Sequence, residues 1–110
     1  MEAKAIAKFQ RVSPRKTRLV AKNVQGKGVE EALNILRFTP NKPAGVIYGV
    51  LKSAVANAEY KGLNTDDMVI RTISASRGRV TPGHMARAHG RATEWNQDTV
   101  NLEVIIEEVE

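Results

Sequence analysis

Apolar and polar side chains alternate in two segments, which is the pattern of half-buried β-strands, and a third segment has the composition of a strand. Residues 3–10 alternate loosely, with the odd-numbered positions from Ala3 to Phe9 on one side. Residues 68–75 are rich in β-branched side chains, and residues 100–106 alternate strictly between apolar and polar types. The sequence therefore predicts three strands, of which the last two pair antiparallel.

Between the first and second strands, apolar residues recur at helical spacing. Ser13 precedes the first of these segments, where its hydroxyl can accept a hydrogen bond from an amide of the first turn. Leu19, Val20 and Val24 form the apolar side of that helix. Gly26 and Gly62 are well placed to end the first and third helices. The spacing predicts three helices: residues 14 to about 25, residue 29 to a point before Pro40, and from near 43 to 60.

Residues 77–95 join the last two predicted strands and contain almost no side chains that could pack in a hydrophobic core. They include four arginines, two histidines, three glycines and one proline. We interpret this segment as a long protruding β-hairpin, which we call the ribbon. Its length would be on the order of 30 Å at ~3.3 Å per residue. The predicted fold class is α+β, with three helices packed on one face of a small antiparallel three-stranded sheet. Residues 1–110 then form a single domain with 77–95 as an extended arm.

The net charge of +5 hides a strong segregation of charge along the chain. Residues 1–27 carry eight basic side chains against Glu2 alone, and residues 66–92 carry five arginines against two aspartates. Residues 93–110 carry six acidic side chains and no basic one. Two basic surfaces and one acidic strand on a small domain are typical of a nucleic-acid-binding protein.

The amino-acid composition argues against several other classes of protein. A length of 110 residues suits one domain, and the absence of cysteine excludes disulfides, thiolate metal ligands and thiol nucleophiles. No run of about 18 apolar residues exists, and the first residues lack the apolar core of a signal peptide. We therefore expect no membrane span, no secretion by that route, no cofactor, no bound metal and a monomer in the free state.

The start of the first helix has two interpretations. Ser13, Arg15, Lys16 and Arg18 could bind a phosphate, because a helix N-terminus and three cations attract the same anion. Alternatively, Ser13 only caps the helix and the basic residues form a solvated face. The basic charge of residues 1–27 favours contact with nucleic acid.

His84 and His89 lie five residues apart near the expected ribbon tip and raise the alternative of a metal-dependent nuclease. Such a site needs a nearby carboxylate or a third ligand, and the nearest acid in the sequence is Glu94. We interpret both histidines as polar contacts to phosphate or bases. A further alternative is an architectural DNA-binding protein, because a basic β-ribbon also enters the minor groove of DNA.

Two other side chains each have two possible roles. Trp95 can stack on a base or pack on the body near the root of the ribbon. Asn57 lies close to the apolar stripe of the third helix and can either bond locally or reach RNA.

The segment RVSPRKTRLVAKNVQGK, residues 11–27, resembles the N-terminal signature of the large-subunit ribosomal protein twenty-two family. The resemblance continues through EEALNILRF, through SAVANAE and into the ribbon, and it spans essentially the whole chain at the spacing of that family. Ala86 stands where the family has proline, and residues 94–98 replace a basic run. The ribbon residues that fit the PRAxGRA element of the family are Arg87, Ala88, Gly90, Arg91 and Ala92.

The resemblance implies a structural, non-enzymatic constituent of the large ribosomal subunit in the cytoplasm. A protein of this family binds and bridges several domains of large-subunit rRNA, joins the particle early in assembly and extends its hairpin along the peptide exit tunnel. The implied partners are the rRNA, neighbouring large-subunit proteins and the nascent peptide. With this resemblance, the residues expected to contact RNA are Lys4, Lys8, Arg11, Ser13, Pro14, Arg15, Lys16, Arg18, Lys22, Lys27, Arg77, Arg79, His84, Arg87, His89, Gly90 and Arg91.

Overall fold

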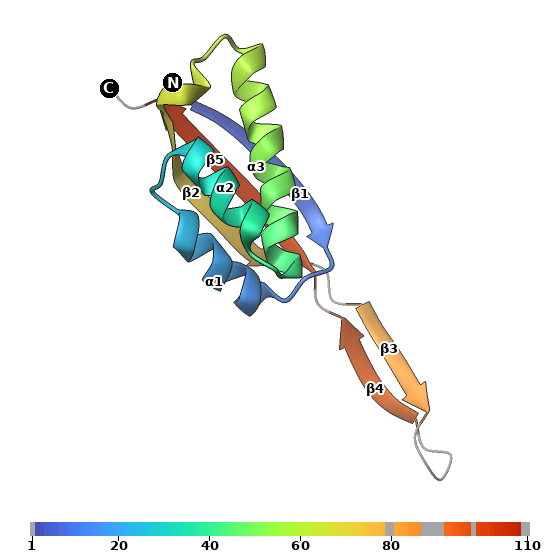
Figure 1. Cartoon of the computed structure of the whole chain (residues 1–110). Coiled ribbons are helices and arrows are strands. Elements are labelled where there is room, and N and C mark those ends of the chain that lie inside the picture. Colours follow the sequence, from blue (N-terminus) through green and yellow to red (C-terminus); the bar gives the residue numbers. More distant parts are fainter. Residues whose placement is uncertain (1, 79–80, 87–91, 98, 109–110) are drawn as a thin grey trace.

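Figure 1 shows the fold in a computed structural model that describes residues 2–78, 81–86, 92–97 and 99–108, with the backbone alone for 81–86 and 92–97. The predicted helices and long strands are all present, with small differences at their ends. The elements follow one another as β1 (Glu2–Gln10), α1 (Pro14–Val24), α2 (Val29–Phe38), α3 (Lys42–Tyr60), a 3-10 turn η1 (Thr65–Asp67), β2 (Met68–Arg77), β3 (Thr81–Ala86), β4 (Ala92–Gln97) and β5 (Val100–Glu108).

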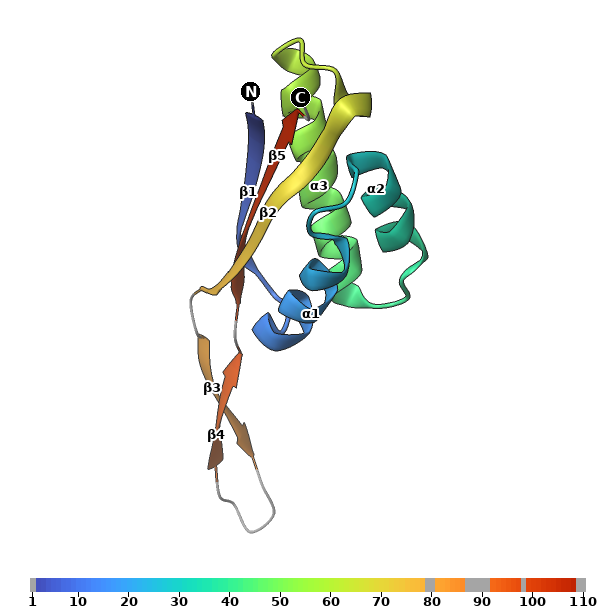
Figure 2. The same ribbon diagram turned by 90° about the vertical axis from the view of Figure 1, so that its left-hand side faces the viewer.

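β5 is the central strand of a three-stranded antiparallel sheet with the order β1-β5-β2. Its Val104 lies opposite Ala5 of β1 on one side and opposite Ile73 of β2 on the other. All three helices lie on one face of this sheet (Figure 2). The structure therefore confirms the α+β fold class and the antiparallel pairing of the two predicted C-terminal strands.

The core lies between this sheet and the helices. Ile47 and Leu51 of α3 are completely buried, and so is Leu102 on β5. From Val100 to Ile106, every second residue of β5 is completely buried, because the central strand turns this side toward the helical layer. Burial of these side chains is the main force that holds the two layers together.

Two apolar residues that the pattern grouped with buried positions are exposed. Leu19 is 60% exposed, because the buried side of α1 follows Thr17, Val20 and Val24, and Leu19 points away from that stripe. Phe9 is 56% exposed, because β1 contains one extra residue. Ala7 lies opposite Leu102 and Gln10 lies opposite Val100, so three steps on β1 match two on β5. The grouping of Leu19 with Val20 and Val24, and of Phe9 with the other odd-numbered positions of β1, is wrong for these reasons.

The start of α1 is also held differently from the prediction. Ser13 occupies the N-cap position, but its hydroxyl makes no hydrogen bond to the first turn. Instead, the Ser13 carbonyl accepts the Thr17 amide at 3.0 Å and the Thr17 hydroxyl at 2.7 Å. Thr17 is completely buried, so its hydroxyl requires a partner inside the protein. The predicted hydroxyl cap is therefore wrong, and a threonine one turn later ties down the helix start.

The glycines expected to end two helices do so. Gly26 and Gly62 have φ angles of +85° and +79°, in the left-handed region that side chains disfavour. After α3, Gly62 donates to the carbonyl of Glu59 and Leu63 donates to that of Ala58, each at 3.0 Å. This pair of bonds closes the end of the helix.

Both edges of the sheet are covered by groups from the helical layer. On the β1 edge, Asn57 Nδ2 donates to the Lys4 carbonyl at 2.8 Å, and Lys61 Nζ donates to the Glu2 carbonyl at 3.2 Å. On the β2 edge, the turn after α1 exchanges two backbone hydrogen bonds with Ile70, each 2.9 Å long. These bonds occupy backbone groups that would otherwise be open for pairing. Asn57 therefore bonds within the protein, to β1, and its contact with RNA stays a prediction.

β3 and β4 form a separate antiparallel pair, with Thr81 opposite Gln97 and Ala86 opposite Ala92. Figure 1 shows this pair beyond the end of the main sheet, where β2 ends and β5 begins. At the root, Gly78 donates its amide to the Thr99 carbonyl at 2.8 Å. Residues 79–80 and 87–91 lie outside the described residues, so a continuous arm over 77–95 stays a prediction.

Candidate nucleic-acid interface

Charged residues gather at opposite ends of the sheet. At the end where the ribbon leaves, Gln10, Val100 and Arg77 lie side by side in one row, and α1 begins beside them (Figure 1). We call this the ribbon end. At the other end, Glu2 lies opposite Glu107. The acidic end comprises Glu2, Asp66, Asp67, Glu107 and Glu108.

Arg71 is held at the acidic end. Its Nη1 lies 2.6 Å from Glu2 Oε2, and its Nε lies 3.9 Å from Glu107 Oε2. All three side chains are about half exposed, so each pair contributes at most ~1 kcal/mol to stability. Arg71 therefore helps to neutralise the carboxylates of the acidic end.

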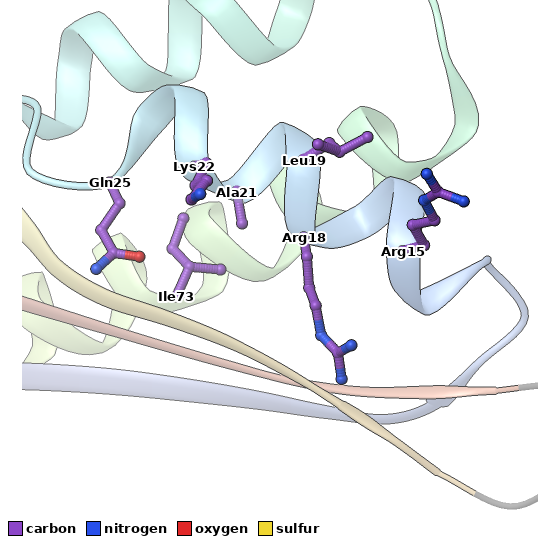
Figure 3. A pocket seen from close by; sticks show the side chains of 7 residues that line it. All are labelled: Arg15, Arg18, Leu19, Ala21, Lys22, Gln25 and Ile73. Atoms are coloured by element: carbon purple, nitrogen blue, oxygen red, sulfur yellow. The ribbon is translucent and has the colours of Figure 1, made fainter.

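A basic groove runs between α1 and β2 toward the ribbon end. One hollow of about 430 Å³ is lined from α1 by Arg15, Arg18, Leu19 and Lys22, and from β2 by Ile73 (Figure 3). A second hollow of about 430 Å³ shares Arg15 and Arg18 with the first. The two hollows are neighbours, and we call them together the α1 groove. Its lining is Ser13, Pro14, Arg15, Arg18, Leu19, Ala21, Lys22, Gln25, Ile73 and Arg77.

The lining of the α1 groove is strongly positive. It contains the exposed cations Arg15, Arg18, Lys22 and Arg77, and none of the described residues in the lining is a carboxylate. Several cations along one shallow depression raise the local concentration of anions and favour a ligand that carries many negative charges. The exposed Leu19 adds an apolar surface within this charged groove. The groove can therefore contact both the phosphates and the less polar parts of a nucleic acid strand.

Arg18 also has a structural role in the α1 groove. Its Nε donates to the Ala75 carbonyl at 2.9 Å, so the side chain crosses from α1 to the edge of β2 (Figure 3). This bond fixes the guanidinium at the centre of the groove. The remaining donors of the group suit a phosphate, since a fixed guanidinium loses little entropy on binding.

The structure does not bring Lys16 together with Arg15 and Arg18, although the sequence grouped the three. Lys16 lies on another side of α1 and lines a separate hollow of about 260 Å³. Asn41 and Pro43, at the start of α3, lie across that hollow. Ser13, Arg15 and Arg18 do line one hollow, together with Arg77. Any phosphate contact by Lys16 therefore belongs to a second site.

The other predicted site residues divide into three groups. Lys4, Lys8, Arg11 and Lys27 are exposed on β1 and in the turns before and after α1. Pro14 is buried at the first turn of α1, where it serves the fold. The predictions that lie outside the described side chains are Arg79, His84, Arg87, His89, Gly90 and Arg91, and the same holds for Trp95.

Sequence reasoning missed Gln25 and Ile73 as lining residues of the α1 groove. Gln25 follows Arg15, Arg18 and Lys22 at helical spacing, so the periodicity of the cations could have predicted it. Ile73 comes from a strand far away in the sequence, and no local pattern links it to α1.

The described residues give no support to a metal centre. In that part of the chain, no three His, Asp or Glu side chains gather in a way that suits a metal ion. The proposed pair His84 and His89 lies outside the described side chains. Among the helices that the structure describes, none is long and apolar enough to cross a membrane.

Comparison with known proteins gives one consistent family. Residues 5–107 match the family model of ribosomal protein L22p/L17e. The chain is 63% identical over 109 residues to the large ribosomal subunit protein uL22 of Desulfovibrio desulfuricans, covering 98% of this chain and 97% of the relative. It is 52% identical to uL22 of Nitratidesulfovibrio vulgaris strain DP4 and 50% identical to that of Lawsonia intracellularis, with the same coverage in both cases. The chain therefore belongs to the ribosomal protein L22p/L17e family, which confirms the resemblance drawn from residues 11–27 and the prediction that it is not an enzyme.

Proposed function

We propose that this protein is a structural constituent of the large ribosomal subunit, where it binds large-subunit rRNA through the ribbon end. The observation that carries the proposal is the α1 groove, where the described lining residues include four exposed cations and no carboxylate. Family membership supplies the class of ligand, since the relatives are named as large-subunit proteins. We expect the protein to work on ribosomes in the cytoplasm.

The binding mechanism is electrostatic and depends on shape more than on base identity. Arginine and lysine side chains of the α1 groove neutralise phosphates and release the counterions around them. Contacts to phosphates fix the position of the protein on the RNA but carry no sequence information. Specificity then comes from the three-dimensional shape of the folded rRNA, because only some phosphate pairs match the spacing of the cations.

The separation of the cations supports our proposal that the protein bridges rRNA domains. The α1 groove and the hollow beside Lys16 lie on different sides of α1, so two RNA segments can bind the same helix. The predicted cations of the ribbon, Arg79, Arg87 and Arg91, would add a third contact further along the molecule. A small protein that joins segments from separate domains stabilises their arrangement, which suits a role early in assembly.

The ribbon is the part of the chain that we assign to the peptide exit tunnel. Its paired strands β3 and β4 extend beyond the main sheet (Figure 2). An arm of this kind reaches partners that the body does not touch, and we propose the tunnel wall and the nascent peptide as those partners. Neighbouring large-subunit proteins would meet surfaces of the body that are free of RNA, such as the acidic end.

Sedimentation of a cell lysate tests the proposal. The protein, followed with an antibody, is expected to sediment with the large subunit and to stay there after a high-salt wash, because many phosphate contacts act together. The matched control is the same lysate after ribonuclease treatment, in which the protein should leave these fractions. Two results would contradict the proposal and favour an architectural DNA-binding protein. One is sedimentation as a free protein in the untreated lysate, and the other is sedimentation with DNA after ribonuclease treatment.

A further inference from the structure

Phe9 combines three features that the fold itself does not require. Its φ angle of +57° lies in the left-handed region, where a bulky side chain is an outlier. It occupies the extra residue of the β1 bulge, and its side chain is 56% exposed. Strained backbone at a bulge persists where the surrounding structure enforces it, and such positions gather at functional sites.

Asn101 of β5 enforces this conformation. Its Oδ1 accepts the Phe9 amide at 3.0 Å, and this bond occupies the donor that the bulge removes from the sheet ladder. Gly78, directly after β2, leaves room for the Asn101 side-chain amide, since a Cβ at Gly78 would stand 3.0 Å from Asn101 Oδ1. Three residues from three distant segments therefore act together, and the result is an aromatic ring held outside the core.

The position of Phe9 suggests what the ring meets. Phe9 precedes Gln10, which lies in the same row of the sheet as Val100 and Arg77 at the ribbon end. Lys8 and Arg11 flank it and are exposed. An aromatic ring between cations is the arrangement by which proteins hold a single-stranded nucleic acid: cations bind the phosphates and the ring stacks on a base.

We propose that Phe9 is a stacking platform for one unpaired base of large-subunit rRNA. The proposal rests on the proposed function and adds a contact of a different kind, because stacking is apolar whereas the α1 groove binds through charge. The strained bulge turns the ring from the inner side of the sheet to solvent, and the flanking cations hold the backbone of the same nucleotide. RNA offers such bases in loops and bulges, where they are not stacked on neighbours.

Four variants test the platform, with purified protein and protein-free large-subunit rRNA. Phe9→Ala is expected to weaken binding by roughly five- to a hundredfold, the range for loss of one stacked base. Phe9→Tyr keeps a ring and should bind like the parent. Tyr60→Ala is the matched control, because Tyr60 is 94% exposed at the end of α3, next to Lys61, which bonds to Glu2 at the acidic end. Asn101→Ala releases the bulge and should resemble Phe9→Ala.

The dependence of affinity on salt separates this proposal from the electrostatic one. Phe9 is uncharged, so Phe9→Ala should shift the line of log affinity against log salt without changing its slope. Chemical probing should show one base that is protected by the parent and by Phe9→Tyr and is reactive with Phe9→Ala. If the parent does not bind the rRNA, the proposed function itself fails.

If the parent binds and Phe9→Ala binds equally well, the stacking platform is wrong and the electrostatic account stands. Normal rRNA affinity for Phe9→Ala, together with poorer retention in the assembled subunit, would show that the ring meets a neighbouring protein and would also overturn the proposal. Thermal unfolding of each variant verifies that the fold is intact.

Discussion

Replacement of Arg15 and Lys22 together by glutamine should reduce the slope of log affinity against log salt by about 1.4 to 1.8 for large-subunit rRNA, since each phosphate contact contributes ~0.7 to 0.9. Both side chains are exposed and line the α1 groove. Arg18 is left unchanged, because its bond to the Ala75 carbonyl also supports the fold. Filter binding over a series of salt concentrations measures the slope.

The matched control removes the same charge from another part of the protein. Arg37 lies beside the Phe38 ring on α2, and Lys52 lies beside the Tyr48 ring on α3. Replacement of this pair by glutamine lowers the net charge equally but leaves the α1 groove intact. The slope should then stay close to that of the parent. Equal slopes for both double variants would mean that net charge, and not the α1 groove, governs binding.

Gly78→Ala is expected to destabilise the fold by about 1 to 3 kcal/mol, the cost of forcing an extra methyl group into a packed site. The new Cβ would stand 2.7 Å from Thr99 Oγ1 and 3.0 Å from Asn101 Oδ1. Thr99 is only 7% exposed, so its side chain has little space to move. The change should also disturb Asn101, which holds Phe9. Urea unfolding gives the difference in the free energy of unfolding.

Gly49→Ala adds the same methyl group at a site with open space around it. This change should stabilise the fold instead of destabilising it. Gly49 lies within α3, and an added Cβ would meet no atom within 4 Å. Alanine in a helix interior is favoured over glycine by about 1 kcal/mol. The free energy of unfolding should therefore rise by up to about 1 kcal/mol. A loss of stability at Gly49, or none at Gly78, would refute this account of the ribbon root.

The parts of the fold that the sequence predicted well are those in which one periodicity governs a long segment. β5 is central and has one side completely buried, so its alternation is strict and easily recognised. α3 buries a broad stripe against the sheet, and its end is marked by Gly62. In each case burial acts at every turn or every second residue, and the pattern carries that information directly.

The predictions that were wrong concern features that depend on single residues and on contacts between distant segments. The bulge that exposes Phe9 adds one residue to β1, and the hydrogen bond that holds it comes from Asn101. The buried Thr17 holds the start of α1 in place of the Ser13 hydroxyl. No local pattern reports such partners, because each depends on how strands and helices meet in space.

The candidate site was predicted as a set of cations but not as a surface. Basic charge along residues 1–27 indicated the class of ligand and most of the residues. The sequence could not show that Arg77 joins Arg15 in one groove, or that Lys16 lies apart from both. Those relations come from the packing of α1 on β2.

Directed cleavage of rRNA tests most directly the claim that the ribbon end faces RNA and the acidic end does not. The chain has no cysteine, so Ser13→Cys in the α1 groove at the ribbon end and Asp66→Cys at the acidic end each carry one iron chelate at a known place. In complexes with large-subunit rRNA, we expect strong, localised strand cleavage from position 13 and little from position 66. Equal cleavage from both positions, or stronger cleavage from position 66, would contradict the account.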